Sequence, residues 1–153
     1  MKPTVNSDGY RTVTPYLKLP NCQRLIDFMK TAFNATERGK LTKPDGSILH
    51  SELMIGDTLL MVHEQPGHWT PKPCTLYLRV DDVDDTYQQA LAAGAVSVFE
   101  PANMYYGART ACVTDTAGND WWIASRLEEL SLDEIQDRAT AYLKENRNLK
   151  AAH

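Results

Sequence analysis

The stretch YYGARTACVTDTAGNDWWIAS, residues 105–125, decides the fold of this chain. Turn-forming residues at 115–119 separate an apolar flank at 111–113 from an aromatic and β-branched flank at 121–123. Two such flanks around a short turn are typical of a β-hairpin. Because successive side chains of a strand point to opposite faces of the sheet, we expect Trp121 to pack against a helix and Trp122 to face the other side.

The composition restricts the class of protein. Of the 153 residues, 42% are hydrophobic and 24% are charged, which is enough apolar material for one domain with a core. No apolar run approaches the ~20 residues of a membrane span, and the N-terminus lacks the apolar centre of a signal peptide. We therefore expect a cytoplasmic protein that does not bind membranes.

Charge and cysteine content exclude two further classes. The net charge of −4 and the pI near 5.5 argue against nucleic acid as a partner, because phosphate contacts depend on clustered Lys and Arg. The cysteines Cys22, Cys74 and Cys112 are odd in number and lack a metal-type spacing. They are interpreted as reduced, small apolar residues rather than as a disulfide framework.

The elements fall into two halves around a linker at 65–73, which holds three prolines. After a loose tail at 1–11, the first half is predicted as a strand at 12–19, a helix capped by Asn21, strands at 35–42 and 47–55, and a strand at 58–64. The second half is predicted as a strand at 74–80, a helix at 82–93, a strand at 96–99, a loop through Pro101 and the hairpin described above. A capping box at 131–134 opens a C-terminal helix that is expected to end near 144.

The two halves repeat each other. The tetrads YLKL at 16–19 and YLRV at 77–80 match in kind, and each is followed at once by a helix start. A β-α-β-β-β unit covers one face of its sheet with its helix and buries the other against its twin. The predicted fold is therefore α+β, with modules at 12–64 and 74–126 forming one domain, an incompletely closed mixed barrel around a cleft. Residues 127–153 form a helical appendage.

Several short motifs occur in a characteristic order. They are TPYL at 14–17, Asp45-Gly46, HSEL at 50–53, IGD at 55–57, Tyr106-Gly107, Arg109, Asp115, Gly118 and WWIA at 121–124. Together with the paired modules, this order resembles the glyoxalase/bleomycin-resistance superfamily, also called vicinal oxygen chelate proteins, and within it the PhnB-like branch. The chain departs from that pattern at Ala108, where an acidic residue is usual, and at Thr116-Ala117, where proline and an aromatic residue are usual.

The resemblance implies a divalent metal ion held by four ligands, from the first and last strands of each module. By strand register these places fall at Thr14, Met61, Thr75 and Trp122. Hydroxyl, thioether and indole groups are poor ligands for such ions, so the sequence predicts neither a metal nor another cofactor.

A second constellation leaves three interpretations open. His50 and Glu52 share one face of a strand, and His63 and Glu64 end the next strand. These residues form a metal site of the His/carboxylate type, or His50 and Glu52 act as an acid/base pair, or the two are a polar pair within the sheet.

The same register indicates which side chains face the cleft, namely Tyr16, Lys18, Met61, His63, Tyr77, Arg79 and Trp122. Arg109, next to Tyr105-Tyr106, is a further candidate ligand-binding residue because a guanidinium there could clamp an anion. Aromatic and basic walls suit a planar or anionic organic ligand. The alternative is that Lys18, Arg79 and Arg109 simply reach water.

Two function classes remain. The first is a metal-free binding protein that sequesters a small organic ligand. The second is an enzyme, such as a lyase, an isomerase or a dioxygenase-like protein, with a non-standard metal site or with His50 and Glu52 as catalytic groups. Since family members commonly complete their clefts by dimerising, a two-fold homodimer is expected in either case.

Overall fold

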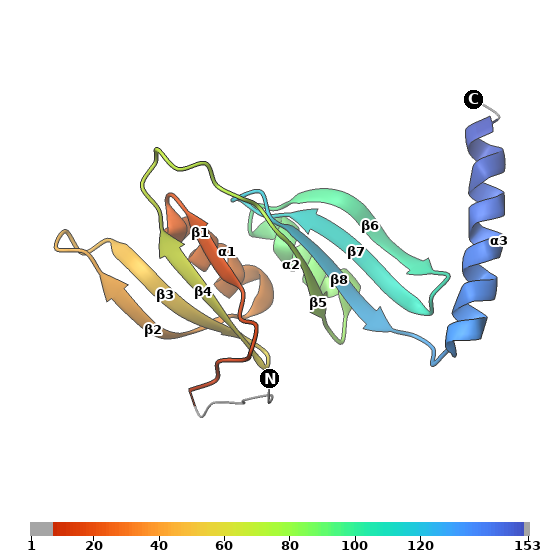
Figure 1. The fold of residues 1–153 in the computed structure, drawn as a ribbon, viewed down its shortest axis with the longest axis horizontal. Helices are drawn as coiled ribbons and strands as arrows, with labels where there is room; N and C mark the ends of the chain where they lie inside the picture. Colours follow the sequence, from red (N-terminus) through yellow and green to blue (C-terminus); the bar gives the residue numbers. More distant parts are fainter. Residues whose placement is uncertain (1–7, 152–153) are drawn as a thin grey trace.

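Two units with the same order of elements make up most of the chain (Figure 1). The computed structural model describes residues 8–151, with side chains described for 8–146. The first unit consists of β1 (Tyr16–Leu19), α1 (Cys22–Phe33), β2 (Thr36–Thr42), β3 (Ile48–Ile55) and β4 (Thr58–Glu64). The second consists of β5 (Thr75–Arg79), α2 (Val83–Ala92), β6 (Val96–Met104), β7 (Ala108–Thr114) and β8 (Asp120–Arg126), and α3 (Leu132–Ala151) follows it.

Each unit forms a four-stranded mixed sheet. The strand orders are β1-β4-β3-β2 and β5-β8-β7-β6, with β1 parallel to β4 and β5 parallel to β8. Tyr16 lies opposite Met61 in the first sheet and Tyr77 lies opposite Trp122 in the second, so the repeat extends to the register. The predicted fold class and the internal repeat are confirmed.

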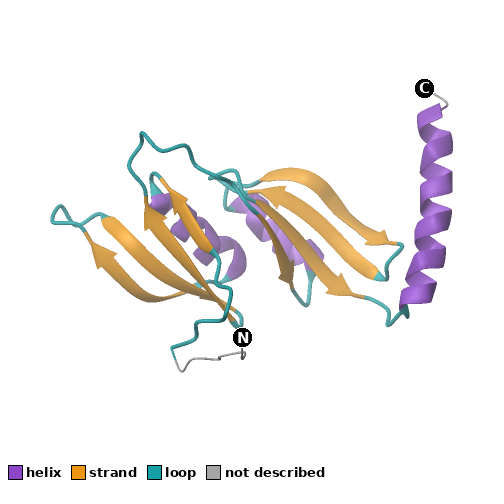
Figure 2. Cartoon of the chain, in the orientation of Figure 1, coloured by secondary structure: helices purple, strands orange, loops and turns teal. Residues whose placement is uncertain are grey.

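The two sheets lie side by side and are not closed on each other (Figure 1). Helices α1 and α2 pack together and cover one face of each sheet, as the purple helices behind the strands show in Figure 2. Among the described residues, no helix covers the opposite faces, and within one chain neither unit buries this face against its twin as expected. We call the opposite faces the open faces of the N-terminal sheet (β1–β4) and of the C-terminal sheet (β5–β8).

One continuous core joins the two units. Leu25, Ile26 and Met29 of α1 are fully buried, and they belong to the same apolar cluster as Val83 and Tyr87 of α2. Removing a side chain of this size from water stabilises the fold by roughly 1.5–3 kcal/mol.

Trp121 packs the hairpin of β7 and β8 against this core. It is 2% exposed, and its ring lies 4.6 Å from that of Phe33 at the end of α1. Trp122 points to the open face instead, beside Phe99 at 6.1 Å. The two neighbouring tryptophans therefore lie on opposite sides of β8, as the alternation predicts.

The start of α1 is stabilised by a residue that the sequence did not indicate. Asn21 adopts a left-handed conformation with φ 58° and makes no side-chain capping bond, so its predicted capping role is wrong. Instead the Glu64 carboxylate accepts the backbone N–H groups of Asn21 at 3.0 Å and Cys22 at 2.8 Å. Burial raises the pKa of Glu64, but these hydrogen bonds outweigh it and leave the pKa below its ordinary value of 4.5.

The Glu64 cap makes stability depend on pH. Because the pKa of Glu64 is lower in the folded than in the unfolded state, its contribution is complete above 4.5 and is lost as the pH falls through the folded pKa. Glu64→Ala should lower the free energy of unfolding by about 1 kcal/mol at pH 7. Urea unfolding should show that the difference in free energy of unfolding between the wild type and Glu64→Ala shrinks as the pH falls below 4.5. Glu100→Ala, which removes an exposed carboxylate on β6, is the matched control and should unfold as the wild type does at every pH.

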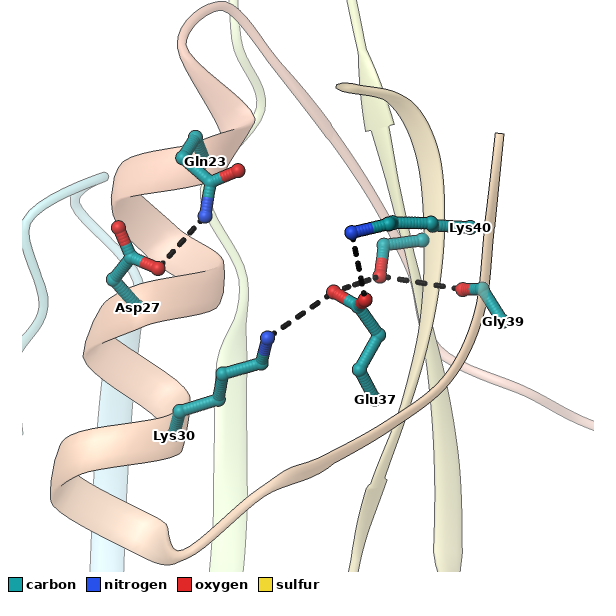
Figure 3. Close-up of polar contacts among 7 residues, drawn as sticks. Gln23, Asp27, Lys30, Glu37, Gly39 and Lys40 are labelled. Atoms are coloured by element: carbon teal, nitrogen blue, oxygen red, sulfur yellow. Dashed lines mark hydrogen bonds and ion pairs between the residues drawn. The ribbon is translucent and has the colours of Figure 1, made fainter. Parts of the chain in front are cut away.

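A polar cluster fixes β2 against the helix layer (Figure 3). Glu37 forms ion pairs with Lys30 of α1 at 3.2 Å and Lys40 of β2 at 3.5 Å, and Ser51 donates to it at 3.4 Å. Burial opposes ionisation of Glu37, yet the two lysines prevail and lower its pKa. The cluster therefore links α1, β2 and β3 on the side away from the open face.

Two strands differ in extent from those expected: β1 begins at Tyr16 rather than at residue 12. The predicted loop through Pro101 is wrong, because β6 runs from Val96 to Met104 with a register shift between Phe99 and Ala102. β6 is an edge strand, where a proline is tolerated because its missing N–H need not pair.

The C-terminal helix stands apart from both sheets (Figure 1). It extends beyond the expected end to Ala151, and its capping box forms as predicted, with Ser131 accepting from the Glu134 backbone at 3.2 Å. Tyr142 packs on Tyr105 with ring centroids 4.9 Å apart. Across residues 8–151, no helix is both long and apolar enough to cross a membrane.

Candidate functional site

Two rows of side chains cross the open face of the N-terminal sheet, because the register aligns every second residue of its strands. The first row is Tyr16, Met61, Glu52 and Gly39, and the second is Lys18, His63, His50 and Leu41. The Tyr16 ring meets those of His50 and His63 edge-on at 6.1 and 6.2 Å, and the two imidazoles are 5.7 Å apart. The structure thus brings together six of the residues singled out from the sequence.

The second row is rich in basic groups. Burial lowers the pKa of His63 below its ordinary value of 6.5, and the neighbouring His50 and Lys18 lower it further. His63 is therefore held neutral at physiological pH. An anion placed on this row would favour its protonation.

Glu52 is engaged by a residue from the N-terminal segment. The phenol of Tyr10 donates to the Glu52 carboxylate at 2.5 Å and lies 3.5 Å from the sulfur of Met61. In the described part of the chain no hydrogen bond joins Glu52 to His50. The geometry therefore does not form the pair that the acid/base interpretation requires.

The residues present do not fit a metal ion. The places implied by the family hold two hydroxyls, a thioether and an indole, and Thr14 bonds locally to Arg11. Glu64 cannot join His63, because it lies on the other face and caps α1. Within residues 8–151, no three His, Cys, Asp or Glu side chains gather closely enough to hold a metal. We assign no chemical step to one.

The open face of the C-terminal sheet is more apolar than its counterpart. One row holds Tyr77, Trp122, Cys112 and Phe99, and the next holds Arg79, Ala124, Thr110 and Ala102. Tyr77 is 62% exposed, and Trp122 lies between it and Phe99. The arrangement presents a row of aromatic side chains with a guanidinium beside it.

A pocket of about 440 Å³ opens next to Arg79. Its walls include Tyr77, Arg79, Tyr106, Arg126, Glu128, Glu129, Leu130 and Ile135, so the start of the C-terminal helix contributes to it. Arg126 pairs with Glu129 at 3.2 Å, whereas Arg79 forms neither an ion pair nor a side-chain hydrogen bond within the described residues. Arg79 is thus available to an anion entering this pocket.

A larger cavity of about 710 Å³ lies between the two units. Phe33, Trp121, Tyr77 and Arg79 line it, but so do the carboxylates of Asp57, Asp81, Asp82 and Asp85. This concentration of negative charge is unfavourable for an anionic ligand. The two carboxylates of the smaller pocket, Glu128 and Glu129, are paired with Arg138 and Arg126, so that pocket suits an anion better.

Arg109 does not lie with the other candidate ligand-binding residues on the open faces. It lies on the helix face of β7, where its guanidinium donates to both carboxylate oxygens of Asp84, at 2.5 and 2.7 Å, and to Asn103 at 2.9 Å. The ion pair lowers the pKa of Asp84. The period of two places Arg109 on the same face as the buried Ala111, and this signal could have identified its position.

Sequence reasoning also missed one residue of the site. Tyr10 belongs to a segment that was predicted to be a loose tail, and it forms no part of a helix or strand. No periodicity therefore indicates where its side chain lies. Residues 1–7 of that predicted tail are outside the described part of the chain.

Comparisons with known proteins agree with this geometry. Residues 17–123 match the model of the Glyoxalase/Bleomycin resistance protein/Dioxygenase superfamily. The uncharacterized protein Mb0911c from Mycobacterium bovis is 32% identical over 135 residues, covering 81% of this chain and 89% of the relative. The Arabidopsis thaliana gene product AT5G48480 is similar in structure, with a TM-score of 0.62, 26% identity and coverage of 75% of this chain and 98% of that one.

A PhnB protein from Bacillus cereus, described as a putative 3-demethylubiquinone-9 3-methyltransferase, shares the fold. The TM-score is 0.58 at 12% identity, with 74% of this chain and 98% of that one covered. The resemblance inferred from the motifs is confirmed. The chain belongs to the Glyoxalase/Bleomycin resistance protein/Dioxygenase superfamily.

Proposed function

We propose that this protein binds a planar, anionic organic molecule on the open face of its C-terminal sheet, without a metal ion, and that it does so as a two-fold homodimer. The observation that carries the proposal is Arg79, a guanidinium without a partner in the described chain, beside an aromatic row and a pocket of about 440 Å³. That volume lies within the range of small-molecule sites.

The chemistry of the ligand follows from the two features. A planar ring stacks on Tyr77, which is 62% exposed and lines the pocket, and Trp122 lies next to Tyr77 in the same row. A carboxylate or similar anion accepts two parallel N–H bonds from the guanidinium of Arg79. Burial of aromatic surface supplies affinity, and the cation selects for charge. Sequestration needs no further group.

The acid/base alternative lacks comparable support. It requires Glu52 and His50 to exchange a proton, but the Glu52 carboxylate is bonded to Tyr10. We therefore retain binding as the proposed activity.

Exposed aromatic side chains support the homodimer. Tyr16 on one open face is 46% exposed and Tyr77 on the other is 62% exposed. A second copy laid over these faces would remove both rings from water and would shelter the exposed sheet edges. Soluble monomers rarely leave large apolar patches uncovered.

Titration of a matched pair of probes tests the proposal. The Arg79→Ala variant should bind 2-naphthoate at least about tenfold more weakly than the wild type, because a charged hydrogen bond contributes roughly 1.5–3 kcal/mol. Its affinity for naphthalene-2-carboxamide, which has the same rings without the charge, should change little. Arg24→Ala, on the exposed side of α1, is the control and should bind as the wild type does.

Two readouts accompany the titration. Naphthoate should quench tryptophan fluorescence, and most of the quenching should disappear in Trp122→Phe. Light scattering should give twice the 17.2 kDa mass of the chain. Equal naphthoate affinity in the wild type and Arg79→Ala would refute the ligand assignment, and a monomer mass at micromolar concentration would refute the dimer.

A further inference from the structure

The N-terminal segment, residues 8–15, crosses the open face of the N-terminal sheet from one edge to the other. It leaves β1 at Pro15, whose carbonyl accepts from Met61, and reaches β2, where Arg38 donates to the carbonyl of Asp8. Between these points Tyr10 reaches Glu52 on β3. The segment contains no helix or strand, and only a few hydrogen bonds hold it to the sheet.

The place that Tyr10 occupies has the character of a binding site. Its phenol donates to Glu52 at 2.5 Å, the short length of a charge-assisted O–H···O⁻ bond, and it also contacts the thioether of Met61. This bond and the burial that accompanies it raise the pKa of Tyr10, so the group is a neutral donor. Tyr16 continues the same row beyond Met61 and adds an aromatic wall.

The residue beside Glu52 on the neighbouring strand has no side chain. This residue is Gly39 of β2, and a Cβ built there would lie 4.0 Å from the Glu52 carboxylate. Any larger residue at that position would begin to cover the carboxylate. The open flank gives a small molecule access to the acceptor that Tyr10 now uses.

We infer that Tyr10 is a built-in occupant of a binding site for a neutral phenol, and that such a ligand enters by displacing the N-terminal segment. The exchange replaces one phenol–carboxylate bond with another of the same kind. Among the described residues, only a few hydrogen bonds from residues 8–15 to the sheet oppose it, and segments held by few such bonds open readily. Glu52 accepts and cannot donate when ionised, so it selects a hydroxyl donor and repels a carboxylate.

This site is distinct from the pocket at Arg79. It lies on the other sheet, it prefers a neutral donor to an anion, and none of its residues lines that pocket. Arg79→Ala should leave phenol binding unchanged. The two proposals therefore stand or fall separately.

Competition between Tyr10 and a free phenol has a measurable consequence. If Tyr10 occupies the site about nine-tenths of the time, the apparent affinity for a free phenol is reduced about tenfold. Removal of the Tyr10 side chain should restore that affinity. The natural probe is p-cresol, which has the ring and hydroxyl of tyrosine, and toluene is its matched control without the hydroxyl.

The test is a titration of the full chain with both probes, followed by calorimetry and by the ring-proton NMR signals of His50 and His63. Tyr10→Ala should bind p-cresol about tenfold more tightly than the wild type does, and more tightly than it binds toluene. In the Tyr10→Ala/Glu52→Leu double variant the preference for p-cresol should vanish. With Glu52→Gln in its place, part of the preference should return because the amide oxygen still accepts.

Two further variants make the result unambiguous. Tyr10→Phe keeps the ring but cannot bond to Glu52, so it should also bind p-cresol more tightly than the wild type, even if truncation to alanine disturbs folding. Tyr142→Ala, which removes a tyrosine from the C-terminal helix, should behave as the wild type. Equal p-cresol affinity in the wild type and both Tyr10 variants, or equal affinity for p-cresol and toluene, would overturn the inference.

Discussion

Replacing Trp121 with alanine should lower the free energy of unfolding by about 3–5 kcal/mol, a large share of the stability of a typical domain. The indole is 2% exposed, packs on Phe33 at 4.6 Å and donates to Asp115 at 2.8 Å. The substitution leaves a cavity where the two units meet and removes a buried hydrogen bond. Urea or thermal unfolding of the purified variant measures the loss.

Trp122→Ala is the matched control for this prediction, since it truncates the same side chain one residue away on the same strand. Trp122 faces the open side of the C-terminal sheet, so its loss removes less buried surface and should cost clearly less. If Trp122→Ala proved the more destabilising of the two, the assignment of the faces of β8 would be wrong.

Asp115→Ala should have an effect of similar size, at least about 3 kcal/mol. The Asp115 carboxylate is 6% exposed and accepts from the backbone N–H groups of Ala117 and Asn119, from the Asn119 amide and from the Trp121 indole. Alanine leaves these donors without their acceptor inside the turn. The result would be visible as a lower midpoint in chemical denaturation.

A milder substitution, Trp121→Phe, distinguishes the loss of the Asp115 carboxylate from the loss of one of its donors. Trp121→Phe removes one of the bonds to Asp115 and keeps most of the packed ring, so it should cost less than Asp115→Ala. A loss below about 1 kcal/mol for Asp115→Ala would show that the turn does not depend on this carboxylate.

Local patterns predicted the fold well. The hairpin around Asp115 and the capping box at Ser131 both arise from neighbours in sequence, and the structure confirms them. The repeated tetrads located β1 and β5 because both are short strands with alternating burial.

Long-range contacts could not be predicted in the same way. Glu64 reaches the start of α1 from a strand 42 residues later, and Tyr10 reaches Glu52 across the same separation. In both cases a polar side chain satisfies a partner that only the tertiary fold brings near. The packing of α1 on α2, which lies between the two sheets' helix layers, is likewise a contact between residues far apart in the sequence.

The open faces were predicted in part. Alternation placed Tyr16, Lys18, Tyr77 and Arg79 correctly away from the helices, since every second residue of β1 and β5 is exposed. Arg109 was assigned to the cleft on its charge and its aromatic neighbours, although alternation with Ala111 places it on the helix side, where Asp84 of α2 is its partner.

The single core shared by both units has a consequence for measurement. Although the two sheets look separate in Figure 1, their helices bury one continuous apolar cluster, so the halves should melt in one cooperative transition. By linkage, a compound that binds only the native chain raises the midpoint of that transition whichever sheet it contacts. A thermal-shift screen of the intact protein therefore surveys both open faces at once.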